Sequence, residues 1–165
     1  MKIVGIVMGS KSDLPIVQKA KEVLDEYQVP FEMRVLSAHR CPEEVKEFAA
    51  SAHDSGFSVL IAAAGMAAHL AGAIAANTAL PVIGIPCRSS GSDGMDALLS
   101  TVMMPPGVPV ATVGIDGAKN AALLAVQIMA ASDPELYQKL LESKDKNREA
   151  VLEADKEVSE EFNLR

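Results

Sequence analysis

Residues 2–13 read KIVGIVMGSKSD, an apolar run that passes directly into a turn of Gly, Ser and Asp and then into a helical pattern. A continuous apolar run is typical of a buried parallel strand. The turn offers a glycine for close backbone approach, two hydroxyls and the N–H groups of a helix start, which favour an anion such as phosphate. Because Asp13 would repel phosphate, its carboxylate is expected to accept from a sugar hydroxyl or to cap the helix. Many α/β domains begin this way without a ligand, so phosphate binding and a purely structural turn stay about equally open.

Apolar runs alternate with helical patterns along the rest of the chain. We expect strands near residues 2–8, 31–36, 57–62, 82–85 and 110–113, and helices over 13–27, 42 to about 56, 66–78 and 118–131. This alternation is typical of a parallel sheet covered by helices on both faces, which predicts an α/β fold. A chain of 165 residues is expected to form a single domain, 1–165.

Two of the predicted helices, 66–78 and 118–131, are apolar on nearly every side. Because a chain of this size rarely hides two such helices, and small side chains permit close helix approach, we predict a homo-oligomer. Burial of both helices within one subunit is the alternative. Residues 133–165 are strongly charged with a thin stripe of Leu and Val, which predicts a helical arm that packs on a neighbouring subunit or lies solvated on the surface.

Charge and composition exclude several classes of protein. A net charge of −7 argues against a nucleic-acid partner. The longest apolar stretch, residues 59–74, is interrupted by two glycines and a histidine, so no membrane span is predicted. The N-terminus enters a strand with no leader pattern, which predicts a cytoplasmic protein. Cys41 and Cys87 form neither a redox motif nor a metal pair, and the sequence contains no metal-ligand cluster.

The loops that follow the strands form the candidate site, because ligands of open parallel sheets lie beyond the carboxyl ends of the strands. In one of these loops, His39 stands beside Arg40 and just before a predicted helix start. Both features favour a neutral imidazole that is poised to take up and release a proton, although a loop histidine bonded to the backbone is the alternative. Arg40 suits bidentate contact with phosphate or carboxylate, or an ordinary surface ion pair.

The other two histidines are interpreted differently. His69 follows a loop of Ala and Gly at a predicted helix start, where it could hold a carboxylate or serve structure alone. His53 lies among polar neighbours on a predicted helix and is expected on a solvated face. The loop from Arg88 to Gly94 has a flexible composition, which suits either a lid or a plain surface loop.

Five motifs, in the same order and at compatible spacing, resemble those of one enzyme family. They are GSKSD at 9–13, SAHR at 37–40, AAHL at 67–70, MPPGVPV at 104–110 and KNAALLA at 119–125. The family is the bacterial-type N5-carboxyaminoimidazole ribonucleotide mutase of purine biosynthesis, and the resemblance covers residues 1 to about 160.

The resemblance implies a fold, an activity and an assembly. The fold would be a flavodoxin- or Rossmann-like three-layer α/β/α sandwich. The activity would be an isomerase that moves a carboxylate from the exocyclic amine of an aminoimidazole ribonucleotide to ring carbon 4, with no metal or organic cofactor. The assembly would be an octamer, which agrees with the apolar helices and the charged arm.

The resemblance also implies roles for residues in the loops after the strands. His39 would transfer protons, and His69 would lie with Leu70 near the carboxylate. The remaining substrate-binding residues would be Gly9, Ser10, Ser12, Asp13, Ser37, Ala38, Arg40, Ala64 and Gly65. Among these, Ser10, Ser12 and Arg40 would hold the phosphate, Asp13 the ribose, and Ser37, Ala64 and Gly65 the base.

One branch of the family instead carboxylates the aminoimidazole ribonucleotide with CO2. Arg40 and His69 resemble the mutase branch, because the carboxylase branch typically has Lys at the first position and a different third loop. Three residues depart from the family pattern: Met66 stands where Gly is usual, Met103 where Gln is common, and Ala71 where Pro is frequent. These changes affect the expected shape of the pocket.

A flavodoxin-like electron carrier is the alternative from another class, since a Ser-rich loop after the first strand also suits a flavin phosphate. The chain has no Trp, and its two Tyr fall on predicted helices, so little is available to stack a flavin ring. A phosphoacceptor domain would need Asp at the end of the third strand, where this chain has Ala62–Ala64.

Overall fold

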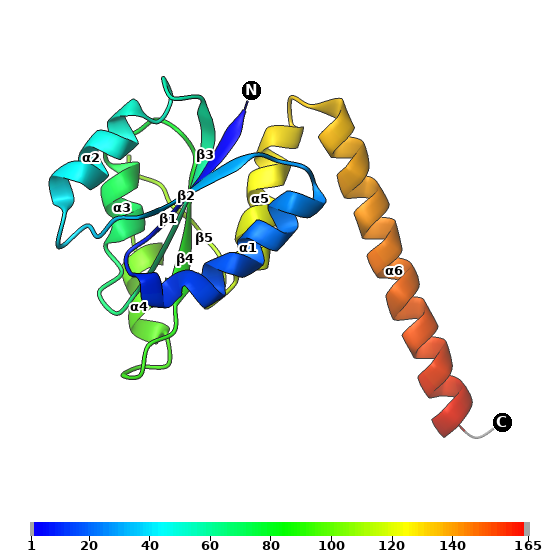
Figure 1. The fold of residues 1–165 in the computed structure, drawn as a ribbon. Coiled ribbons are helices and arrows are strands. Elements are labelled where there is room, and N and C mark those ends of the chain that lie inside the picture. The colour runs from blue at the N-terminus through cyan, green and yellow to red at the C-terminus, as the bar shows by residue number, and fades with distance from the viewer. Residues whose placement is uncertain (1, 164–165) are drawn as a thin grey trace.

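Five parallel strands form one sheet at the centre of the structure, a computed structural model that describes residues 2–163 (Figure 1). The strands are β1 Ile3–Met8, β2 Phe31–Val35, β3 Phe57–Gly65, β4 Val82–Cys87 and β5 Ala111–Thr112. Their order is β2-β1-β3-β4-β5, and every neighbouring pair is parallel. This is the strand order of flavodoxin-like doubly wound folds. The predicted α/β class is confirmed.

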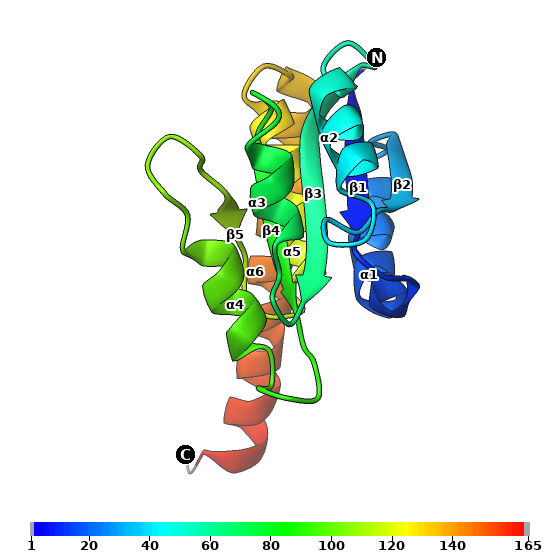
Figure 2. The same cartoon turned by 90° about the vertical axis from the view of Figure 1, so that its left-hand side faces the viewer.

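Helices cover both faces of the sheet, which gives the three layers that the family resemblance implied. They are α1 Leu14–Glu26, α2 Pro42–Ser51, α3 Leu70–Ala75, α4 Met95–Val102, α5 Ala118–Ala130 and α6 Pro134–Phe162, with a short 3-10 turn, η1 Lys11–Asp13, before α1. Helices α1 and α5 lie on one face and α2, α3 and α4 on the other (Figures 1 and 2). No helix among residues 2–163 is both long and apolar enough to cross a membrane.

The central strands are apolar throughout because both of their faces are buried. In β1, Val4 and Ile6 pack into the core under α1 and α5, whereas Val7 packs into the core under α2 and α3. Side chains alternate between the faces of a strand, so a strand with two covered faces needs apolar residues at successive positions. This requirement explains the unbroken apolar run that opens the chain.

Two strands run further than predicted, and the helices beside them change accordingly. β3 pairs with β4 as far as Gly65 and Cys87, where the prediction ended these strands at 62 and 85. The helix predicted over 66–78 therefore begins only at Leu70, after a turn in which Met66 has a positive φ of 57°. Helix α2 ends at Ser51, so His53 lies in the following turn rather than on a helix. Its side chain is exposed, as predicted.

Helix α5 is buried by its own subunit. It packs against α1, the sheet and α6, and its buried residues are Ala118, Ala121, Ala122, Ala125, Val126, Met129 and Ala130. Its apolar character on nearly every side is thus explained within one chain, which is the alternative that the sequence left open. This helix does not by itself require an oligomer.

Helix α6 begins on the body of the protein and then leaves it. Its N-cap Asp133 accepts from the N–H groups of Glu135 and Leu136. Leu136 and Leu140 are buried against α5, whereas the later turns project away from the sandwich (Figure 1). The apolar side chains of these turns include Val151, Val158 and Phe162, all of which are exposed. The role of this arm in assembly stays a prediction.

Gly84 sets how closely α4 and the loop before β5 approach the sheet. A Cβ atom at this buried position of β4 would meet Thr101 Cγ2 of α4 and would lie 3.0 Å from Val110 Cγ1. We expect Gly84→Ala to lower the free energy of unfolding by about 1–3 kcal/mol through overpacking, measured by urea denaturation. The control is Gly91→Ala, because no atom lies within 4 Å of a Cβ there and its effect should stay within about 0.5 kcal/mol. Equal stability of the two variants would contradict this account.

Candidate active site

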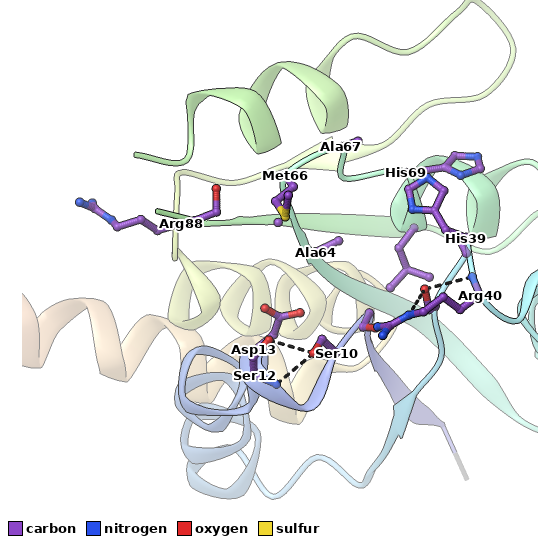
Figure 3. Close-up of a pocket in the computed structure, with 16 residues that line it drawn as sticks. Ser10, Ser12, Asp13, His39, Arg40, Ala64, Met66, Ala67, His69 and Arg88 are labelled. Atoms are coloured by element: carbon purple, nitrogen blue, oxygen red, sulfur yellow. Dashed lines mark hydrogen bonds between the residues drawn. The ribbon is translucent and has the colours of Figure 1, made fainter. Parts of the chain in front are cut away.

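A cavity of about 700 Å³ opens beyond the carboxyl ends of β1 and β3 (Figure 3). Strand order reverses there, because the chain moves from β1 outward to β2 and then back across β1 to β3. Such a switch point is where ligands bind in open α/β sheets. The cavity is lined by Gly9, Ser10, Ser12, Asp13, Ser37, Ala38, His39, Arg40, Ala64, Gly65, Met66, Ala67, His69, Leu70, Arg88 and Ser89.

The turn after β1 brings two hydroxyls together on one side of the cavity. Ser10 has an extended backbone with φ of −150°, and its Oγ accepts from Ser12 N at 3.3 Å and from Ser12 Oγ at 2.9 Å. Ser10 thus caps η1, which turns the chain sharply into α1. The paired hydroxyls line the cavity and can donate to an anion that displaces their mutual hydrogen bond.

Asp13 is the N-cap residue of α1, but its side chain makes no capping hydrogen bond within the described part of the chain. Of the two roles that the sequence left open, capping is therefore not used. Burial raises the pKa of the Asp13 carboxyl, and a hydrogen bond from the backbone of Ser10 opposes this effect. The half-buried carboxyl lines the cavity and remains available to a ligand hydroxyl.

Arg40 ties the loop after β2 to the loop after β1. Its Nη2 donates to the carbonyl of Gly9 at 3.0 Å, and its Nε donates to Ser37 Oγ at 3.3 Å. These bonds hold the guanidinium beside the Ser10 turn (Figure 3). Since guanidinium carries five N–H groups, these two bonds leave other donors for an anion in the cavity.

His39 and His69 meet at the side of the cavity, although they come from different loops. Their ring centroids are 5.1 Å apart, with an angle of 36° between the ring planes (Figure 3). His39 lies in the turn that precedes α2, and His69 is the N-cap residue of α3 but makes no side-chain capping bond there. Both rings are exposed and line the cavity. Two imidazoles so placed can orient a substrate group and exchange a proton with it.

The last residues of β3, Ala64 and Gly65, form a wall of small residues in the cavity. A Cβ atom at Gly65 would lie 3.2 Å from the carbonyl oxygen of Cys87, so a larger residue would press on β4. Burial raises the pKa of the Cys87 thiol to about 12, with smaller contributions from Asp13 and Asp116. The thiol beneath this wall therefore stays protonated at neutral pH and serves packing.

The comparisons with known proteins agree with one another. A family model described as AIR carboxylase matches residues 3–150. The chain belongs to the AIR carboxylase family. The N5-carboxyaminoimidazole ribonucleotide mutase of Pyrococcus abyssi is 56% identical over 140 residues, covering 85% of this chain and 80% of that protein. The mutase of Bacillus subtilis is 51% identical, covering 92% and 95%. The crystal structure of Treponema denticola PurE superimposes with a TM-score of 0.86 at 26% identity, covering 99% and 100%.

For this AIR carboxylase family member, the structure brings every predicted site residue to one cavity, while the individual roles remain predictions. The sequence did not single out Ala67 and Ser89 as lining residues, and it noted Met66 and Arg88 only as a departure and as the start of a flexible loop. Their position in the sequence could have identified all four as lining residues, because they follow the ends of β3 and β4.

The Arg88 side chain points away from the cavity (Figure 3). Its guanidinium contacts Asp93 Oδ1 at 2.6 Å and Asp116 Oδ2 at 3.4 Å, and its backbone N–H donates to Asp116 Oδ1 at 2.8 Å. These contacts hold the loop from Arg88 to Gly94 against the segment before α5. Among residues 2–163, no group of three or more His, Cys, Asp or Glu is placed to hold a metal ion.

The raised pKa of Asp13 predicts a stability cost in the unliganded protein. A carboxyl whose folded pKa exceeds its unfolded value stabilises the fold when protonated, and this contribution is lost as pH rises through the folded pKa. We therefore expect Asp13→Asn to raise Tm at pH 7 by about 1–3 °C, since the side chain is only partly buried. The gain should shrink as pH falls toward 3, where both states are protonated. A variant less stable than the wild type at pH 7 would show that the ionised carboxylate stabilises the fold.

Proposed function

We propose that this chain is an N5-carboxyaminoimidazole ribonucleotide mutase, which converts its substrate to 4-carboxy-5-aminoimidazole ribonucleotide. The observation that carries the proposal is the meeting of His39 and His69, 5.1 Å apart, in the same cavity as the Ser10 turn and Arg40. A ribonucleotide needs an anion site, a hydroxyl acceptor and a pocket for a flat base, and the cavity offers groups suited to each. The names of the relatives from Pyrococcus abyssi and Bacillus subtilis support the same assignment.

The substrate is placed by matching each of its parts to the chemistry of the wall. The phosphate lies against the hydroxyls of Ser10 and Ser12 and the guanidinium of Arg40, because these are donors and one carries a positive charge. Asp13 accepts from the ribose hydroxyls, because a carboxylate accepts hydrogen bonds from hydroxyl groups but repels a phosphate. Ser37, Ala38, Ala64 and Gly65 border the base, and His69 with Leu70 lies near the carboxylate that moves. The backbone of Gly9 anchors Arg40 through its carbonyl.

The reaction balances with one proton taken up and one returned. When the bond between the exocyclic nitrogen and the carboxylate carbon breaks, CO2 forms and the nitrogen takes a proton. Ring carbon 4 then attacks CO2, forms the new carbon–carbon bond and loses its own proton. In this scheme His39 enters the cycle as the imidazolium, not as the neutral form that its neighbours in sequence favour. It gives the first proton and accepts the second, so it ends the cycle as it began. His69 beside it orients the carboxylate at the start and at the end.

The cavity contributes to this reaction by holding the freed CO2 near the ring carbon that it must rejoin. A freed CO2 molecule held near ring carbon 4 meets it at an effective concentration far above that of dissolved gas. Walls made of Ala64, Gly65 and Leu70 offer CO2 no groups with which to react.

We further propose a homo-oligomeric assembly, an octamer by family resemblance, in the cytoplasm. Its support on this chain is exposed apolar surface. Helix α4 carries an exposed apolar stripe formed by Met95, Leu99 and Val102, and its C-cap Met103 is exposed as well. Helix α6 adds the exposed apolar residues of its later turns. Cys41 and Cys87 are free thiols, which agrees with a reducing compartment.

The assignment of mutase over carboxylase predicts a choice of substrate. Purified protein is given N5-carboxyaminoimidazole ribonucleotide in one assay, and aminoimidazole ribonucleotide with bicarbonate in the other, and the 4-carboxy product is measured. We expect rapid conversion in the first assay and a rate at least about 100-fold lower in the second at equal substrate concentration, because only the first reaction delivers CO2 inside the cavity. Conversion in the second assay alone would assign the carboxylase activity instead.

The role of His39 predicts a loss of turnover without a loss of folding. We expect His39→Asn to lower kcat by about 10²- to 10⁴-fold, the range typical of a lost general acid–base group. Tm should change by less than about 2 °C, because the side chain is exposed. The matched control is His53→Asn, which alters an exposed histidine outside the cavity and should leave both values unchanged. Near-normal turnover of a folded His39→Asn variant would remove His39 from this role.

A further inference from the structure

Met66 has a backbone conformation that disfavours every side chain. Its φ is 57°, in the left-handed region, and it directly follows the last residue of β3. The turn is held by short-range hydrogen bonds, from Ala68 N to the carbonyl of Met66 at 2.9 Å and from His69 N to the carbonyl of Ala67 at 2.7 Å. Glycine adopts this conformation without the clash that a Cβ atom creates. The chain therefore carries a methionine where the backbone would favour glycine.

Packing of the Met66 side chain within the protein does not offset this strain. It is 67% exposed, whereas the core methionine of β1, Met8, is only 2% exposed. Two other exposed methionines, Met95 and Met103, have no such strain, since neither has a positive φ. Such strain gathers at active sites and ligand-binding segments. Among the non-glycine residues with positive φ in the described part of the chain, Met66 is the one that lines the cavity.

The position of Met66 indicates which part of a ligand it meets. It lines the cavity beside Ala64, across from Ser10, Ser12 and Asp13 (Figure 3). Phosphate and ribose are assigned to that opposite turn, so the base faces the Met66 side. Ala64, Gly65 and Ala67 supply little side-chain surface there, and Leu70 is buried. Met66 is the one large apolar side chain of the lining that is exposed.

We infer that Met66 is a specificity-determining residue, whose thioether chain packs against the face of the substrate base. This inference rests on the proposed function, because it takes the ligand to be an aminoimidazole ribonucleotide. An unbranched, polarisable side chain adapts its shape to a flat ring and makes favourable contacts between sulfur and the aromatic system. Met66 increases the affinity for the base and leaves the contacts of the phosphate unchanged.

Three variants separate the side chain from the strain. Met66→Ala removes the thioether and keeps the Cβ atom, Met66→Gly removes both, and Met66→Leu keeps an apolar side chain of similar volume. Each folded variant is titrated by calorimetry with aminoimidazole ribonucleotide and with ribose 5-phosphate, which has the same phosphate and sugar but no base. Tm is measured for each unliganded variant. Binding of these probes requires no turnover.

We expect the Ala and Gly variants to bind aminoimidazole ribonucleotide about 5- to 10-fold more weakly than the wild type, as lost burial of apolar side-chain surface predicts. The Leu variant should stay within about 3-fold of the wild type, since similar volume preserves most of the contact. Affinity for ribose 5-phosphate should be the same in all four proteins. The Gly variant should have a Tm about 2–4 °C above that of the Ala variant, because only glycine relieves the strain.

Several results would overturn the inference. They are unchanged ribonucleotide affinity in both the Ala and Gly variants, an equal loss for ribose 5-phosphate, and failure of the wild type to bind aminoimidazole ribonucleotide. Failure of the proposed function has a different signature. A wild type that binds this ribonucleotide but does not convert N5-carboxyaminoimidazole ribonucleotide would refute the mutase assignment, while the binding series would still decide the role of Met66.

Discussion

The parallel pairing of β1 with both β2 and β3 is the constraint on which the site depends. β1 lies between the strands that follow it in sequence, so the chain must leave β1 in one direction and return past it in the other. This reversal leaves a crevice at the ends of β1 and β3 that no crossover helix fills. Residues 31 positions apart, Gly9 and Arg40, are joined there by a hydrogen bond. The site thus follows from topology before any particular side chain is considered.

The positive charge of Arg40 and the carboxyl group of Asp13 lie in different parts of this crevice. Arg40 lies beside the Ser10 turn, where an anion is expected, while Asp13 stands at the start of α1 with a carboxyl that burial makes less acidic. A protein carboxylate can line the same site as a phosphate of the ligand only if the carboxylate meets another part of that ligand, because the two negative charges repel each other. The phosphate and sugar of the proposed ribonucleotide substrate would satisfy that condition, with Asp13 meeting the sugar.

The elements with a periodic pattern of apolar residues could be predicted from the sequence. The strand ends and the short helix that depend on contacts between distant segments could not. The β1 run and α1 were assigned closely, because their apolar residues recur at the spacing of strand and helix. The ends of β3 and β4 were placed too early, since only their mutual pairing extends them to Gly65 and Cys87. Short α4 was not assigned, and it packs on β4 through Thr101, a contact that no local pattern reveals.

The same limit applied to the site. The loops were chosen correctly from strand order, but the approach of His39 to His69 depends on α2 and α3 packing side by side, and the left-handed turn at Met66 depends on where β3 ends. Of these two features, the positive φ of Met66 is the one that costs local stability. A continuous apolar core on each face of the sheet supports such a residue, because the strand that precedes it is held by packing elsewhere. The strained turn at Met66 thus follows a strand whose interior is apolar and buried on both faces.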